Sequence, residues 1–302
     1  MESVQIIQSK QINNTLWDAC VLKHQSPIYA TSIYLHSMAS NWAAVVVNDY
    51  EVLLPFCYKK KFGITYLYMP PFLQQLGLVG KTTPAIFALI QQKLFSFVSY
   101  GDFMVNANTN TFLKLQTSVK TNFELKLNKP HENLLQTFHT DFRRLLKRAK
   151  NNHLQYLTSL DTNQAIELYY QNYASRFEQH VNDYKIRLKA LAQKLQHQHQ
   201  CFVRKIVNAE NEILSVGLYL KDDFRIYNIA NTTTSKGRKL ASNFLLFNEV
   251  LNEFENSQLI FDFEGSDLPG VKEFYKMFNP TNQPYYHWHI NNLPWFLKML
   301  KK

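Results

Sequence analysis

One basic stretch of this chain has the residue types that bind a phosphate group. It consists of Ser235, Lys236, Gly237, Arg238 and Lys239 and lies between an apolar, β-prone run and a helical pattern. Free backbone N–H groups and the helix dipole favour an anion at a helix N-terminus. Gly237 would let the backbone approach closely, and the basic side chains add charge and donors, so we predict a phosphate site here. The alternative is an ordinary basic surface loop, because neither a Walker A nor a GxGxxG pattern is present.

The spacing of the histidines and cysteines in the sequence does not predict a metal centre. His287 and His289 flank Trp288 and would share one face of a strand, a spacing compatible with a metal ion. No carboxylate or cysteine lies near them in the sequence, so packing or surface exposure is the favoured interpretation. The three cysteines, Cys20, Cys57 and Cys201, are widely separated and odd in number, which indicates neither a disulfide framework nor a metal site.

The charge balance favours an anionic partner. Lys and Arg total 33 against 23 Asp and Glu, and five basic residues gather in one helical pattern at 143–150. A phosphorylated cofactor, nucleic acid or an acidic lipid surface would fit this excess, and so would surface lysines that serve solubility. No recognition-helix, zinc or stacking-platform pattern accompanies the basic helix, so a solvated face is favoured over duplex recognition.

The chain shows no sign of a membrane or secretory segment. No stretch approaches the ~18 uninterrupted apolar residues that a membrane span needs. The N-terminus lacks a basic region followed by an apolar run, so no signal peptide is expected. Together with the cysteine usage, this predicts a reducing, cytoplasmic location.

The order of expected elements predicts a mixed α/β fold. In the first half, a strand hairpin, a third strand, a helix and further strands are expected at 42–58, 64–68, 83–98, 103–106 and 123–127. In the second half, a basic helix, three strands, a helix, a strand and a short helix are expected at 131–150, 201–207, 213–220, 224–229, from 240, 259–263 and 271–278. The halves are loosely similar in order, which suggests a degenerate duplication.

Three segments of the second half resemble the GNAT acyltransferase superfamily, and within it the tandem, Fem-like branch. The helix Phe142–Lys150 is similar to an Arg-rich RxxxxKA helix, and Asp262–Ser266 (DFEGS) is similar to an Asp-Phe-x-Gly-(Ser) strand end. Pro269–Phe278 (PGVKEFYKMF) is similar to the Gly-Val-x-x-Phe-(Lys/Tyr)-x-x-Phe-Gly motif that follows, with Asn279 in place of the last glycine. Proteins of this branch resemble peptidoglycan-bridge aminoacyltransferases and an uncharacterised bacterial group of similar build.

The resemblance implies two tandem GNAT-like modules, each a central mixed β-sheet flanked by helices. We place them at 1–130 and 131–302, with the donor site in the second. The resemblance also implies that Ser235–Lys239 bind the pyrophosphate of coenzyme A, although only Gly237 matches the usual loop. Tyr275 matches the tyrosine that protonates the leaving thiolate in that superfamily.

Two further residues are candidates for the chemistry. Glu264 could orient or deprotonate an amine nucleophile, because a base that titrates near neutral pH suits acyl transfer. The alternative, a cap or a partner for loop amides, is equally weighted for Glu264 and favoured for Asp262. In a fold of this kind Tyr227 and Asn228 would border the acyl group, but side chains alternate along a strand, so only one of them can face the site. For Tyr227, packing is the favoured alternative.

These features predict an acyltransferase that acts on an amine acceptor held between the modules. Acetyl-CoA or another acyl-CoA is the first expected donor, because the long helical arm of some Fem enzymes is absent. The alternative donor is aminoacyl-tRNA, with a cell-wall precursor as the acceptor. The non-enzymatic alternative is a module that binds an anionic ligand or a cell-envelope partner.

Overall fold

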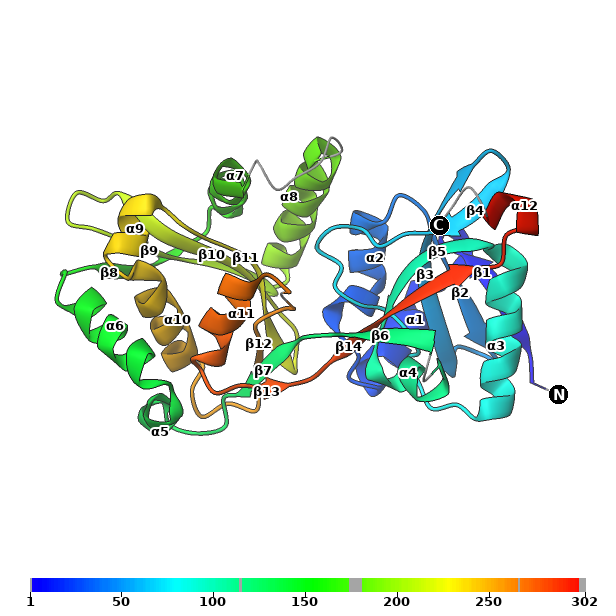
Figure 1. The fold of residues 1–302 in the computed structure, drawn as a ribbon, viewed down its shortest axis with the longest axis horizontal. Helices are drawn as coiled ribbons and strands as arrows, with labels where there is room; N and C mark the ends of the chain where they lie inside the picture. The colour runs from blue at the N-terminus through cyan, green and yellow to red at the C-terminus, as the bar shows by residue number, and fades with distance from the viewer. Residues whose placement is uncertain (1, 114–115, 174–180, 266, 299–302) are drawn as a thin grey trace. The chain divides into compact units, whose positions relative to one another are not determined.

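The computed structural model describes residues 2–113, 116–173, 181–265 and 267–298 (Figure 1). The chain divides into two compact units, of which unit 1 comprises residues 1–120 and 284–302 and unit 2 comprises 121–283. Each unit is built around one seven-stranded mixed sheet. The predicted α/β fold with two modules, each a central mixed sheet flanked by helices, is confirmed. No helix among the described residues is both long and apolar enough to cross a bilayer.

The sheet of unit 1 has the strand order β1-β2-β3-β4-β5-β14-β6. Its neighbours are antiparallel except for the parallel pair β4 and β5. The strands are β1 (Val4–Gln8), β2 (Trp42–Val47), β3 (Val52–Lys61), β4 (Ile64–Leu67), β5 (Tyr100–Val105), β6 (Thr117–Lys120) and β14 (Tyr285–Asn291). A parallel pair needs a crossover connection, and the helix α3 (Pro84–Phe97) lies in the one that joins β4 to β5.

The start of α3 is capped by the residue that precedes it. Thr83 Oγ1 accepts a hydrogen bond from the Ile86 amide at 3.3 Å, and Pro84 occupies the first helical position. The other helical segments of unit 1 are η1 (Ser9–Gln11), α1 (Asn14–Lys23), η2 (Ile28–Ala30), α2 (Ser32–Met38), α4 (Ala107–Leu113) and α12 (Trp295–Lys298).

In unit 1 the chain itself fills the space beyond the parallel pair. β4 and β5 pair over only two residues each before they part. Beyond that point, Leu76 forms a parallel bridge to Val105 of β5, and Val79 forms an antiparallel bridge to Leu53 of β3. The opening between the diverging strands is therefore occupied by backbone and by buried leucine and valine side chains.

The sheet of unit 2 has the order β13-β7-β12-β11-β10-β9-β8, with β11 and β12 as its parallel pair. The strands are β7 (Phe123–Lys126), β8 (Gln155–Ser159), β9 (Cys201–Val207), β10 (Ile213–Lys221), β11 (Arg225–Thr233), β12 (Ile260–Asp262) and β13 (Thr281–Asn282). The helices are α5 (His131–Thr137), α6 (Thr140–Lys150), α7 (Thr162–Tyr173), α8 (Val181–His197), α9 (Ser235–Lys239), α10 (Ser242–Glu253) and α11 (Pro269–Lys276). The centre of β10 is buried without alternation, as expected when both faces of a sheet are covered.

An aromatic cluster forms the centre of the core of unit 2. The ring of Phe247 on α10 lies 5.2–6.2 Å, between ring centroids, from the rings of Phe261, Phe263, Phe274, Tyr275 and Phe278. These partners belong to β12, to the residue after it, and to α11 and its C-terminal end. One side chain of α10 thus contacts both β12 and α11.

The observed elements differ from the prediction in two ways. β14 pairs with β5 and β6, so residues 284–302 belong to unit 1, while β7 pairs with β12 and β13 and places residues 121–130 in unit 2. The units therefore differ in bounds from the predicted modules 1–130 and 131–302. The single helix expected at 131–150 is two helices, because Phe138 ends α5 and His139 caps α6 through its Nδ1.

Replacing Phe247 with alanine is expected to destabilise unit 2 by about 3–5 kcal/mol, because it leaves a cavity among five aromatic rings. Urea unfolding followed by circular dichroism measures this change. Phe62, whose side chain is 91% exposed, offers the matched control, and Phe62→Ala should change the free energy of unfolding by less than about 0.5 kcal/mol. Equal effects of the two substitutions would contradict the central role of Phe247.

Candidate active site in unit 2

The parallel strands of unit 2 part and leave an opening. β11 and β12 pair over only three residues each, and β11 then continues from Asn228 to Thr233. Within the described residues, this length of β11 has a strand partner only on the β10 side. Ligands bind in α/β sheets at the carboxyl ends of strands where neighbouring connections diverge. The free edge of β11 lies at such a position.

A cavity of about 360 Å³ lies beside this edge. Its walls come from the end of β11, from α9, from the N-terminal half of α10, from α11 along its length, and from Tyr173 of α7. The residues with polar side chains along it are Tyr173, Asn231, Thr233, Arg238, Asn243 and Tyr275. Ala241, between α9 and α10, has a φ of 57°, and this left-handed residue turns the chain so that α10 begins at the cavity wall.

Tyr275 lines this cavity, and its side chain has an otherwise apolar setting. Its ring packs against Phe247 and Phe263, and its oxygen accepts a hydrogen bond from Asn228 Nδ2 at 3.0 Å. The same nitrogen lies 3.5 Å from the Phe263 carbonyl, which can only accept, so the orientation of the amide is defined. Burial and the nearby Glu264 carboxyl raise the pKa of Tyr275 above its usual value, so the phenol keeps its proton.

Glu264 lies close to Tyr275 in a strained and enclosed position. Its φ of 64° falls in the left-handed region, which is uncommon for a residue with a side chain. The residue as a whole is partly exposed, but its Oε1 is buried and has no hydrogen-bond partner among the described residues. Burial raises the pKa of Glu264 to about 8. Such a carboxyl can exchange a proton near neutral pH.

Asp262 and Tyr227 are held by other partners. Asp262 accepts hydrogen bonds from the Glu264 amide at 2.9 Å and from Asn122 Nδ2 at 3.3 Å, which is the loop-amide role favoured for it. Burial, followed by repulsion from Glu124, raises the pKa of Asp262 to about 7. The hydroxyl of the fully buried Tyr227 donates to Asp222 Oδ2 at 2.6 Å. Tyr227 does not line the cavity, whereas Asn228 contacts Tyr275.

The predicted phosphate stretch forms the short helix α9, and of its five residues only Arg238 lines the cavity. The amide of Gly237 donates to Thr234 Oγ1 at 3.0 Å, and that of Arg238 donates to the Thr234 carbonyl at 2.9 Å. The side chain of Lys236 pairs with Glu212, and Ser235 Oγ accepts from Arg238 Nη2 at 3.0 Å.

Gly237 is required by packing against the protein itself. A Cβ at this position would lie 2.3 Å from the backbone oxygen of Leu214, on the neighbouring strand β10. The close approach that glycine permits here is therefore to β10. Lys239 is exposed and does not line the cavity.

Two asparagines take part in this site. The sequence predicts that Tyr227 or Asn228 borders the acyl group, and strand alternation allows only one of them to face the site; the structure brings Asn228 to Tyr275. Asn243, the second residue of α10, lines the cavity with a buried Oδ1 that has no partner among the described residues. No pattern in the sequence distinguishes Asn243 from the other asparagines of the chain.

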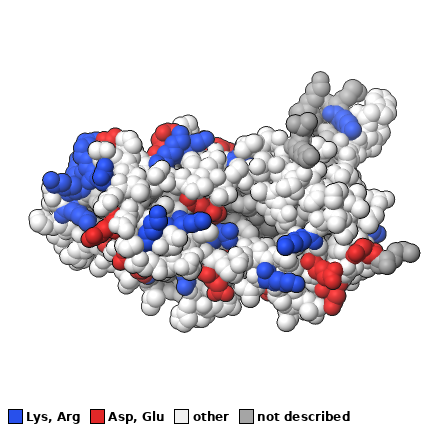
Figure 2. All heavy atoms as spheres, turned by 90° about the horizontal axis from the view of Figure 1, so that it is seen from below, with Lys and Arg blue, Asp and Glu red and all other residues white. Residues whose placement is uncertain are grey.

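The basic face of α6 lies on the surface of unit 2. Arg143, Arg144, Lys147, Arg148 and Lys150 are all exposed, while Phe142, Leu146 and Ala149 are buried. Figure 2 shows lysine and arginine side chains gathered at this end of unit 2. The predicted solvated basic face is thus present, and it remains accessible to an anionic partner.

Comparison with known proteins identifies the class of fold. No protein-family model and no curated protein matches the chain in sequence. Among solved structures, the crystal structure of FemX matches with a TM-score of 0.67 at 12% identity and covers 98% of this chain and 99% of its own. The chain therefore has the overall fold of FemX, in agreement with the Fem-like fold that the sequence resemblance predicted.

Two more solved structures share this architecture over nearly the whole chain. A conserved protein of unknown function from Bacteroides thetaiotaomicron has a TM-score of 0.62 at 12% identity, with 95% of this chain and 100% of that chain covered. L-PGS from Bacillus licheniformis has a TM-score of 0.56 at 11% identity, with 96% and 95% covered. Identities this low establish the fold alone.

The buried carboxyls predict how stability depends on pH. The pKa of Glu264 rises from an ordinary 4.5 to about 8 on folding, and that of Asp262 from 3.8 to about 7. The folded protein therefore binds these protons more tightly than the unfolded chain does. The contribution of the two carboxyls to the free energy of unfolding is expected to be complete below about pH 4 and to be lost as pH rises towards 8.

Glu264→Gln removes one of the two groups and should flatten this fall. Urea unfolding at pH 5 and pH 8 measures how steeply the free energy of unfolding changes with pH in the parent, in the variant and in the control Glu210→Gln. The side chain of Glu210 is exposed in unit 2. The control should keep the parental slope. If Glu264→Gln kept the parental dependence on pH, the prediction that folding raises the pKa of Glu264 would be wrong.

Proposed function

We propose that unit 2 transfers an acyl group from a donor bound in its cavity to an amine acceptor. One observation carries this proposal. Tyr275 lines the cavity, and its hydroxyl oxygen accepts a hydrogen bond from Asn228 and lies near the buried carboxyl of Glu264. The resemblance to acyltransferases of the Fem-like branch, whose fold the chain has, supports the same reaction class.

The reaction needs a proton to pass from the amine to the leaving group. The amine nitrogen attacks the carbonyl carbon of the donor, a C–N bond forms, and the nitrogen loses a proton to the Glu264 carboxylate. The C–S or C–O bond to the donor then breaks, and the leaving thiolate or alkoxide takes a proton from Tyr275. Glu264 returns its proton to Tyr275, and a carboxyl with a pKa of about 8 is suited to both transfers.

The hydrogen bond from Asn228 sets the direction of the Tyr275 proton. Because Asn228 Nδ2 donates to the tyrosine oxygen, the hydroxyl hydrogen must point elsewhere. The cavity that Tyr275 lines offers room for the leaving group of a donor, which would accept this hydrogen. As negative charge develops on the leaving atom, a preorganised donor in an enclosed site stabilises it without reorganisation.

Acyl-CoA is the first donor that we propose. The free edge of β11 beside the cavity offers backbone groups that can pair with an extended ligand containing amides. Arg238 adds a guanidinium at the cavity wall for a phosphate. Two of its donors are used, by the Thr233 carbonyl at 2.6 Å and by Ser235 Oγ, out of the five that a guanidinium carries. Within the predicted stretch Ser235–Lys239, phosphate recognition would thus fall mainly to Arg238.

Aminoacyl-tRNA is the second candidate donor, and two observations favour it. The amides of Gly237 and Arg238 are bonded within α9 and its cap, so they offer no row of free N–H groups to a pyrophosphate. The exposed basic face of α6 could contact a nucleic-acid backbone. The acceptor would then be the amine of a small molecule or of a cell-wall precursor, and either donor would place the reaction in the cytoplasm.

Calorimetric titration of the full chain with acetyl-CoA tests the first donor. We expect binding that Arg238→Ala weakens about tenfold or more, because a charge-assisted hydrogen bond contributes about 1.5–3 kcal/mol. Lys239→Ala is the matched control, since this exposed residue does not line the cavity. Charged tRNA that binds while acetyl-CoA does not, with an affinity that falls steeply with salt, would select the second donor. Binding of neither would contradict a donor site here.

Tyr275→Phe keeps the aromatic packing and removes only the hydroxyl. Turnover of the identified substrate is expected to fall about 10²–10⁴-fold, with donor affinity unchanged, because general acid catalysis is lost. Tyr227→Phe should instead lower the free energy of unfolding, since it breaks the hydrogen bond to Asp222. Unchanged turnover in Tyr275→Phe would remove its acid role, and a comparable loss in Tyr227→Phe would support the predicted role of Tyr227.

A further inference from the structure

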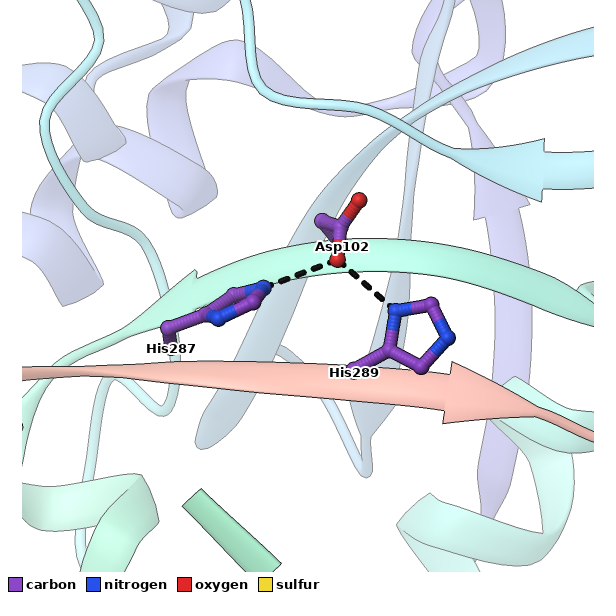
Figure 3. Close-up of side chains that lie close together, drawn as sticks. All are labelled: Asp102, His287 and His289. Carbon is purple, nitrogen blue, oxygen red and sulfur yellow. Dashed lines mark hydrogen bonds and ion pairs between the residues drawn. The ribbon is translucent and has the colours of Figure 1, made fainter. Parts of the chain in front are cut away.

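Three metal-ligating side chains converge on one face of the sheet of unit 1 (Figure 3). His287 and His289 are two residues apart on β14, and Asp102 lies on the neighbouring strand β5. The register of the antiparallel pair places Asp102 directly opposite His289. The sequence interpretation found no carboxylate near the histidines because Asp102 precedes them by more than 180 residues. Strand pairing supplies the missing ligand.

The geometry of the three groups is that of a site focused on one point. Asp102 Oδ1 lies 2.8 Å from His287 Nε2 and 2.8 Å from His289 Nδ1. In Figure 3 both rings direct a nitrogen at this single oxygen. One potential ligand atom from each residue lies within 4.8 Å of the other two. Imidazole nitrogens and a carboxylate oxygen are ligands of zinc, with bonds of about 2.0–2.2 Å.

Small side-chain movements would convert this cluster into a coordination sphere. Tetrahedral bonds of that length separate neighbouring ligand atoms by about 3.3–3.6 Å, which is slightly more than the two hydrogen bonds observed. The side chains of Asp102, His287 and His289 are 53%, 28% and 43% exposed, so they have room to rotate. Their exposure also leaves solvent access to a fourth coordination position.

The backbone beneath the cluster is well supported. β14 is hydrogen-bonded on one side to β5 and on the other to β6. Trp288, between the two histidines, is buried on the opposite face and packs against Phe95 of α3 at 5.8 Å between ring centroids. Tyr100 meets the ring of His289 edge-on at 5.2 Å. Ligands on rigid, packed strands keep their geometry better than ligands on loops.

We propose that Asp102, His287 and His289 bind a zinc ion, with a fourth position open to water or to an oxygen of an anionic ligand. Three protein ligands with one open position are the arrangement of zinc sites that take up an exogenous ligand. The ion would also link β5 to β14, the strand by which the end of the chain returns to unit 1. Zinc binding would therefore stabilise unit 1.

The test is a calorimetric zinc titration of the full chain after treatment with a chelator, together with thermal unfolding followed by tryptophan fluorescence. The four tryptophans, Trp17, Trp42, Trp288 and Trp295, all lie in unit 1 and so report on the unit that carries the site. We expect one zinc per chain and a higher unfolding midpoint with zinc. His287→Ala and His289→Ala should each weaken binding by more than about 100-fold, because loss of a ligand exceeds the effect of losing an outer hydrogen-bond partner.

Asp102→Asn is the conservative third variant, since it keeps the size of the side chain but removes its charge, and it should also weaken zinc binding. The matched control is the double variant His197→Ala/His199→Ala, which removes exposed histidines of the same spacing from unit 2. The control should bind zinc as the parent does. Circular dichroism without zinc verifies that each variant folds, and Co²⁺ in place of zinc reports four-coordination through its visible spectrum.

Two results would overturn the proposal. One is a parent chain that binds no stoichiometric zinc, which would leave the cluster as a hydrogen-bonded His–Asp–His group. The other is zinc binding that persists in His287→Ala and His289→Ala or disappears in the His197/His199 control, which would place the ion elsewhere.

Discussion

The short parallel pairing of β11 and β12 is the constraint on which the candidate site depends. Only three residues of β11 are paired with three of β12. Parallel strands need a crossover connection, and this one brings α9 and α10 to the carboxyl end of β11. Because the pairing stops there, the edge of β11, the cavity and the start of α10 occur together. Unit 1 has the same arrangement at β4 and β5, but Leu76 and Val79 fill the opening. The same topology thus leaves space for a ligand in unit 2 and is packed shut in unit 1.

The aromatic core determines where the chemistry can occur. Phe247 packs against residues of both β12 and α11, so the helix that carries Tyr275 is fixed to the strand that precedes Glu264. The ring of Tyr275 is part of this core, and only its hydroxyl meets polar partners. A functional group supported in this way keeps its position without further contacts. Stability and the geometry of the site therefore depend on the same side chains.

Local patterns predicted the helices and strands of this fold. The pairing of strands that are distant in the sequence could not be predicted from such patterns. Strand and helix periodicity and the segment 262–278 led to the α/β architecture and to the proximity of Glu264 and Tyr275. Nothing local shows that β14 pairs with β5, which moves residues 284–302 into unit 1 and places Asp102 beside two histidines. The role of Gly237 depends on the backbone of Leu214 on another strand, so a basic loop with a glycine could not be distinguished from a phosphate loop.

The candidate site also concentrates unfavourable features. Glu264 has a left-handed φ and a buried oxygen without a partner, and Oδ1 of both Asn228 and Asn243 is buried and unpaired among the described residues. A strained residue or an unsatisfied buried polar atom costs about 1–3 kcal/mol. Packing alone would favour apolar side chains at such positions. An amine that donates to Glu264, and a donor molecule whose polar groups meet these oxygens, would recover part of that cost on binding. The same atoms that destabilise the free protein would then hold the substrates at Tyr275.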